Sequence, residues 1–169
     1  MDFAKLINER FSVRAYKPTS VETEKVDKIL AAGRIAPTAC NNQPQRIRVI
    51  TQAKELGKVD ECTPYRFGAP LVLLVCYDNS KTWHNKFDNS VNSGETDTAI
   101  VVTQMILQAW DIGIGSCWVQ YFDPNKTRQV FDLPDNLVPV TFLPLGYASD
   151  DCKTSRNHGN RVPIKDLLF

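Results

Sequence analysis

The 169-residue sequence lacks the usual marks of a metal site, a dithiol centre or a membrane anchor. Its five cysteines form no Cys-x-x-Cys pair and only two histidines accompany them, so neither a zinc site nor a thioredoxin-like centre is encoded locally. No apolar stretch approaches the roughly 20 residues that cross a bilayer, and the N-terminus lacks the apolar core of a signal peptide. We therefore expect a soluble, cytoplasmic protein with reduced cysteines.

An excess of either charge is also missing. Lysine and arginine number 20 and aspartate and glutamate 19, so the formal net charge is +1, and the basic residues are spread along the chain. This pattern gives no reason to expect nucleic acid or a membrane surface as a partner, and it favours a small molecule. The length and the 43% hydrophobic fraction suit one domain over residues 1–169.

Hydrophobic periodicity predicts a sheet between helices. The continuous apolar run 71–77 is typical of a strand that is covered on both faces. Thr19 and Glu22 have the spacing of a capping box for the second helix, and Pro139 and Pro144 favour an edge position or irregular ends for the last strand. The predicted helices cover residues 2–10, 20–35 and 96–110, and the predicted strands or extended segments cover 46–51, 71–77, 116–122 and 138–145.

The predicted helix 96–110 is apolar around most of its circumference and must be buried on most sides. A chain of this length supplies little mass to surround it, so we expect oligomerisation. The polar segment 78–96 is predicted to be a mobile loop or lid. Glycines 113 and 115 follow this helix instead of opening one, so their spacing does not support a dinucleotide-binding fingerprint.

The run Arg10-Phe11-Ser12-Val13-Arg14 arranges charge without a catalytic side chain. In an extended segment alternate residues share a face, so both guanidinium groups and the hydroxyl can point at one ligand. The planar fork of arginine suits phosphate, and serine adds a compact donor. The run suggests a phosphorylated ligand, with a solvated charged turn as the alternative.

Two further segments carry polar groups of the kind that bind ligands. Residues 36–44 are dense in amides and hydroxyls, which could contact the edge of a pyrimidine-like ring or could satisfy their own backbone. Gln120 stands in an otherwise apolar extended segment, which a purely structural role explains poorly. Arg161 could complete an anion site if the chain end packs back.

Taken in order, these motifs resemble the nitroreductase family of FMN-dependent oxidoreductases. The family pattern Arg-Arg-Ser-x-Arg, followed by an aromatic residue one position later, is matched at Arg10, Ser12, Arg14 and Tyr16, with Phe11 in place of the second arginine. The pattern Ala-Pro-Ser-x-x-Asn-x-Gln-Pro is matched over residues 36–44, where threonine replaces serine. Asp97 begins the family's buried central helix, and the later family segments are matched by Gly113 to Phe122, Gly146-Tyr147 and Arg161-Val162-Pro163.

The resemblance implies an α+β fold with a central mixed β-sheet flanked by helices, in a homodimer with FMN sites at its interface. By this likeness one subunit holds the phosphate and ribityl end and places an arginine near the pyrimidine side of the flavin. Its partner presents the amide-rich loop, and the backbone at 120–121 approaches the flavin N5. The implied cofactor-binding residues are Arg10, Ser12, Arg14, Pro37, Thr38, Asn41, Gln43, Gln120, Tyr121 and Arg161.

The resemblance also implies the reaction. NADH or NADPH would give a hydride to the flavin N5, and a small acceptor such as a nitroaromatic, a quinone or an enone would then take it, without a catalytic side chain. Two alternatives stay open. The chain could be another flavin enzyme on the same scaffold, such as a dehalogenase, or a protein that stores or senses FMN.

Overall fold

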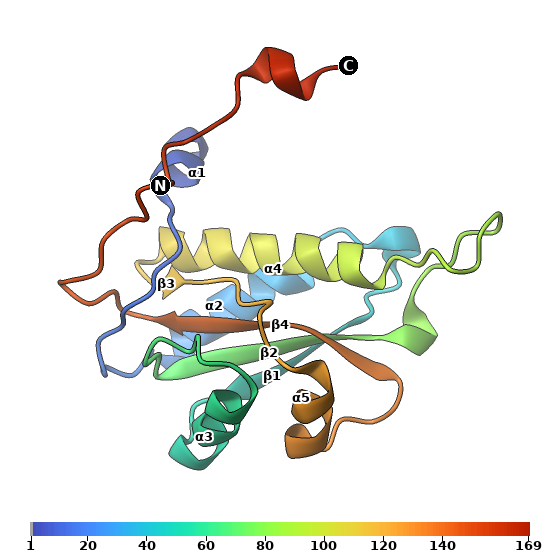
Figure 1. Ribbon diagram of the computed structural model, residues 1–169, viewed down its shortest axis with the longest axis horizontal. Helices are drawn as coiled ribbons and strands as arrows, with labels where there is room; N and C mark the ends of the chain where they lie inside the picture. Colours follow the sequence, from blue (N-terminus) through green and yellow to red (C-terminus); the bar gives the residue numbers. More distant parts are fainter. Residues whose placement is uncertain (1) are drawn as a thin grey trace.

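A four-stranded sheet in the spatial order β1-β2-β4-β3 forms the centre of the computed structural model, which describes residues 2–169 (Figure 1). The ladders between these strands are antiparallel, and an isolated bridge between Ser12 and Ser116 adds a parallel pairing. The predicted α+β architecture is confirmed. The strands are β1 (Gln45–Ile50), β2 (Leu71–Asp78), β3 (Gly115–Ser116) and β4 (Leu137–Gly146).

Helices cover both faces of the sheet. Figure 1 shows α2 and α4 on one face and the shorter α3 and α5 on the other. None of the helices within residues 2–169 combines the length and the apolar character that a membrane crossing needs. The helices are α1 (Phe3–Glu9), α2 (Thr23–Arg34), α3 (Ala53–Cys62), α4 (Gly94–Asp111) and α5 (Pro124–Phe131), with short 3-10 turns at Ala39–Asn41, Asn79–Lys81 and Ile164–Leu167.

Strand β2 lies between two hydrophobic cores, as its continuous apolar run predicts. Leu71, Leu73 and Val75 pack into the core beneath α2 and α4, whereas the alternate residues Val72 and Leu74 pack into the core with α3 and α5. Every residue of β2 is buried. The side-chain period of two therefore divides one strand between two cores.

The edge position predicted for the last strand is wrong, because β4 is paired on both sides by β2 and β3. The predicted irregularity is present, since Pro139 pairs with Cys76 where the β2–β4 register shifts. The carbonyl of Pro144 accepts from the Cys117 backbone N–H at 3.2 Å, on the side of the two-residue strand β3. A missing proline N–H is tolerated at a bulge and beside so short a ladder.

The capping box predicted for the second helix is also wrong. Helix α2 begins at Thr23 with Glu22 as its N-cap, and no side chain closes a hydrogen bond there. The Glu22 carboxylate instead accepts from the hydroxyl of Tyr147 at 2.7 and 2.8 Å. A residue distant in the sequence therefore takes the hydrogen bond that a capping box would use.

Two excursions leave the compact body in Figure 1. After β2 the chain forms a hairpin over residues 82–93, which an isolated bridge between His84 and Asn92 closes. The chain after β4 returns along the N-terminal segment, where the Ser149 N–H donates to the carbonyl of Ala15 at 2.9 Å. Beyond Arg161 it extends away from the body, and residues 162–169 are exposed.

Candidate functional site

The arginine run is docked on the end of β3. Val13 is fully buried, and its N–H donates to the carbonyl of Ser116 at 2.9 Å. Since alternate residues of an extended segment face opposite ways, burying Val13 turns its neighbours Ser12 and Arg14 to the other side. Ser12 is half-buried and Arg14 is exposed, as a ligand-binding face requires.

The buried residue Cys117 lies next to the arginine run, because Ser12 is bridged to Ser116. Burial raises the pKa of Cys117, while the positive charge of Arg14, a hydrogen bond with Ser12 and the charge of Arg10 oppose that rise. Neither arginine forms an ion pair with a carboxylate within residues 2–169. The guanidinium groups of Arg10 and Arg14 therefore have no ion-pair partner among the described residues and are able to bind an anion.

Phe11, which stands where the family pattern has a second arginine, packs instead of binding charge. Its ring centroid lies 5.0 Å from that of Trp110, edge to face, and 6.3 Å from that of His158. Arg161 follows three residues after His158, and its guanidinium donates to the carbonyls of His158 and Asn160. Phe11 thus contacts the part of the chain end that carries Arg161.

A pocket of about 240 Å³ opens beside Arg14. Tyr65 forms part of its wall, with its ring centroid 5.5 Å from that of Tyr121 and 5.7 Å from that of Phe67. The hydroxyl of Thr63 donates to the carbonyl of Tyr121 at 2.6 Å and holds the backbone there. The pocket is lined by Arg14, Tyr65, Phe67, Cys117, Trp118, Val119, Gln120 and Tyr121.

Tyr65 and Phe67 line the pocket but are not among the predicted site residues. They lie in the segment 52–68, which carries no recognised motif. The only signal in the sequence is the presence of two aromatic residues shortly after Thr63-Pro64. The predicted residues Gln120 and Tyr121 do line the pocket and are exposed.

The amide-rich loop has a tightly bent backbone. Cys40, Asn41 and Gln43 have φ angles of 52°, 55° and 50°, in the left-handed region. The Gln43 N–H donates to the Thr38 hydroxyl at 3.1 Å, and the Gln43 side chain donates to the carbonyl of Asn41 at 3.2 Å. The loop thus satisfies part of its own backbone, while the side chains of residues 41–43 stay exposed.

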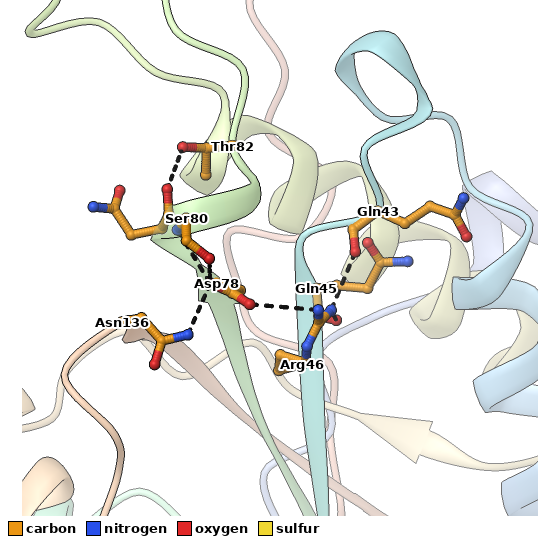
Figure 2. Close-up of polar contacts among 8 residues, drawn as sticks. Gln43, Gln45, Arg46, Asp78, Ser80, Thr82 and Asn136 are labelled. Carbon is orange, nitrogen blue, oxygen red and sulfur yellow. Dashed lines mark hydrogen bonds and ion pairs between the residues drawn. The ribbon is translucent and has the colours of Figure 1, made fainter.

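A polar cluster follows the loop and fixes its far end (Figure 2). The Asp78 N–H donates to the carbonyl of Pro44 at 2.8 Å. The Asp78 carboxylate accepts from Ser80 Oγ at 2.6 Å and from Asn136 Nδ2 at 2.8 Å, and these bonds lower its pKa. Arg46 lies 3.5 Å from this carboxylate and donates to the carbonyl of Gln43 at 3.2 Å. The chain leaving the loop is therefore rigidly held.

A single chain does not bring the loop and the arginine run together. The Ala39 N–H donates to the Asp97 carboxylate in the first turn of α4, whereas Phe11 contacts Trp110 in the last turn. At 1.5 Å per residue these two points of the helix lie roughly 20 Å apart. Within one chain, the loop and the arginine run therefore contact different turns of α4.

Similarity to known proteins identifies the family. The family model described as "Nitroreductase family" matches residues 7–68 and 61–147. The chain belongs to the nitroreductase family. The family prediction is confirmed.

Individual nitroreductase relatives agree. A nitroreductase family protein from Clostridium difficile 630, of known crystal structure, is 40% identical, with a TM-score of 0.93 over 100% of this chain and 98% of that one. A protein from Archaeoglobus fulgidus, whose name marks it as a candidate NADH dehydrogenase/NAD(P)H nitroreductase, is 30% identical over 87% of this chain and 86% of its own length. The FMN reductase (NAD(P)H) of Bacillus subtilis is 23% identical over 86% of this chain and 66% of its own length.

Proposed function

We propose that this nitroreductase-family chain is an FMN-dependent NAD(P)H oxidoreductase that reduces a small acceptor such as a nitroaromatic or a quinone. The observation that carries the proposal is the docking of residues 12–14 on β3, which places Arg14 in the wall of the pocket beside Cys117. Arg10 and Arg14 are both free of carboxylate partners in residues 2–169. A phosphate monoester carries a charge of about −1.5 to −2 at neutral pH and fits such a set of donors. The name of the Bacillus subtilis relative, FMN reductase (NAD(P)H), supports the same cofactor and donor.

The residues present suit FMN in their chemistry. Arg10 and Ser12 would hold the phosphate and ribityl end, and Arg161 would add a third guanidinium from the chain end that Phe11 contacts. Arg14 lines the pocket, where a positive charge beside the pyrimidine ring favours the reduced, anionic flavin. When bound, FMN supplies the hydride transfer itself.

The aromatic pocket suits a planar acceptor. Tyr65, Phe67 and Tyr121 present ring faces and edges, while the backbone of Gln120 and Tyr121 offers polar groups beside them. Offset and edge-on contacts with aromatic rings bind flat molecules well. The pocket therefore supports a nitroaromatic or quinone better than a charged aliphatic acceptor.

The proposal includes a homodimer in which the partner presents Pro37, Thr38, Asn41 and Gln43 to the flavin. The roughly 20 Å along α4 between Asp97 and Trp110 supports a site made by two chains. The extended chain end also carries large exposed apolar side chains, among them Leu167, Leu168 and Phe169. A groove of about 370 Å³ between α1, α2 and α4, lined by Phe3, Leu6 and Leu107 among others, offers an apolar surface for a partner.

The test compares the wild type with two double variants. Arg10→Ala with Arg161→Ala removes two of the proposed phosphate ligands and should lose bound flavin while the circular dichroism stays unchanged. Arg34→Ala with Arg156→Ala removes the same charge from two other exposed arginines and should keep the flavin. Retention of flavin by the first double variant would contradict the phosphate assignment.

The wild type decides between the enzyme and its alternatives. Anaerobic NADH or NADPH should bleach the flavin absorbance, and a quinone or nitroaromatic should restore it. A protein that holds FMN but is not bleached by either nucleotide is a storage or sensing protein. A wild type that cannot be loaded with FMN would overturn the proposal, and rates with both donors and an acceptor panel would name the preferred substrates.

A further inference from the structure

Asp97 is a buried carboxylate that the proposed chemistry does not use. Only 2% of it is exposed, in the first turn of α4. One carboxylate oxygen, Oδ1, accepts from the backbone N–H of Ala39 at 2.9 Å, and the other, Oδ2, accepts from the hydroxyl of Ser93 at 2.7 Å. Both oxygens are thus committed to other segments of the chain.

Ser93 connects this carboxylate to the base of the hairpin 82–93. The Ser93 hydroxyl accepts from the N–H of Trp83 at 3.1 Å, and the Ser93 N–H donates to the carbonyl of Trp83 at 2.9 Å. A continuous series of hydrogen bonds therefore joins Trp83, Ser93, Asp97 and Ala39. Figure 1 shows the hairpin extending from the body next to the start of α4.

The bond at Ala39 lies immediately before the bent part of the amide-rich loop. Cys40, Asn41 and Gln43 are non-glycine residues with positive φ, a conformation that most residues seldom adopt. Such conformations persist only where the surroundings determine them strongly. The Asp78 cluster fixes the far end of the loop, and Asp97 fixes its start.

We propose that Asp97 is a positioning residue that holds residues 38–43 in the shape presented to the flavin and joins that loop to the hairpin 82–93. The proposal rests on the proposed function for the identity of the ligand. The hydrogen bonds, and not the negative charge as such, carry the effect. An asparagine can replace them, because its Oδ1 accepts from Ala39 and a serine hydroxyl can accept as well as donate.

The experiment uses the full chain with Asp97→Ala, Asp97→Asn and Ser93→Ala. Thr98→Val is the matched control, since Thr98 is fully buried in the same turn of α4 and its hydroxyl donates within that helix, to the Gly94 carbonyl at 2.8 Å. Two quantities are measured, the Kd for FMN by fluorescence quenching and the hydrogen exchange rate of the Ala39 amide in the flavin-free protein.

Asp97→Ala should raise the Kd for FMN by about tenfold or more and speed exchange at Ala39, because it removes bonds to a carboxylate. Asp97→Asn should stay within about threefold of the wild type in Kd, and Ser93→Ala should change both readouts by a smaller factor than Asp97→Ala. Thr98→Val should leave Ala39 exchange unchanged.

Three results would overturn the inference. They are equal effects of Asp97→Ala and Thr98→Val on both readouts, an Asp97→Asn variant that binds FMN as weakly as Asp97→Ala, and an Ala39 exchange rate that Ser93→Ala leaves unchanged. A wild type that fails to bind FMN would refute the proposed function instead. The exchange rates would still decide whether Asp97 orders the loop.

Discussion

Replacing Gly115 by alanine tests how the arginine run is held on the sheet. A Cβ at Gly115 would lie 2.6 Å from Val13 Cγ2, 3.0 Å from its Cβ and 3.1 Å from its Cγ1. Val13 is fully buried and β-branched, so it has few rotamers with which to move away. Overpacking of this kind costs about 1–3 kcal/mol.

A double-mutant cycle isolates that clash. Val13→Ala alone should cost about 1.6 kcal/mol for two buried carbons, with a further cavity cost. Val13→Ala also removes the two γ carbons that Gly115→Ala would meet and leaves only the 3.0 Å approach to the Cβ. Adding Gly115→Ala to Val13→Ala should therefore cost much less than adding it to the wild type. We expect the loss in the double variant to be at least about 1 kcal/mol smaller than the sum of the single losses.

The cycle is measured by urea unfolding of the flavin-free protein, with the Kd for FMN as a second readout. Gly57→Ala is the control, since a Cβ at this position in α3 meets nothing within 4 Å. It should gain about 0.5–1 kcal/mol from helix propensity. Losses at Gly115 and Val13 that add within about 0.5 kcal/mol would refute the close contact.

Two further predictions concern pH and the acceptor. Burial raises the pKa of Cys76 from 9.0 to about 12. The unfolded thiol therefore ionises first, and the free energy of unfolding should fall between these pH values by about 1.4 kcal/mol per unit. Cys76→Ala should flatten part of that slope in urea unfolding at pH 8 to 11, and an unchanged slope would contradict the assignment. Tyr121→Ala should raise KM for a quinone about three- to tenfold by removing an aromatic wall, and an unchanged KM would place the acceptor elsewhere.

Sequence patterns predicted the elements whose hydrophobic signal is long and continuous. Strand β2 and helix α4 were found with boundaries within about two residues, because burial on both faces removes polar residues from them. The short helices α3 and α5 were missed. Helix α5 carried a readable signal, since Asp123 accepts from the N–H groups of Asn125 and Lys126 and Pro124 opens the helix.

Motifs predicted which segments carry polar side chains, but they could not show what holds those segments in place. The bond between Ala39 and Asp97 joins residues 58 positions apart, as does the bond between Thr63 and Tyr121. Contacts across such distances leave no local spacing to detect. For the same reason Glu22 looked like part of a cap, although its carboxylate binds Tyr147.

The left-handed backbone of the amide-rich loop lowers the stability of the fold but gives the loop a defined shape. Each non-glycine residue with positive φ costs on the order of 1 kcal/mol or more, and Cys40 at φ 52° is an exposed example. A screen for heat-resistant variants would therefore favour glycine here. The same change would widen the range of shapes that the loop samples, so selection for thermostability and selection for flavin turnover should choose different residues at position 40.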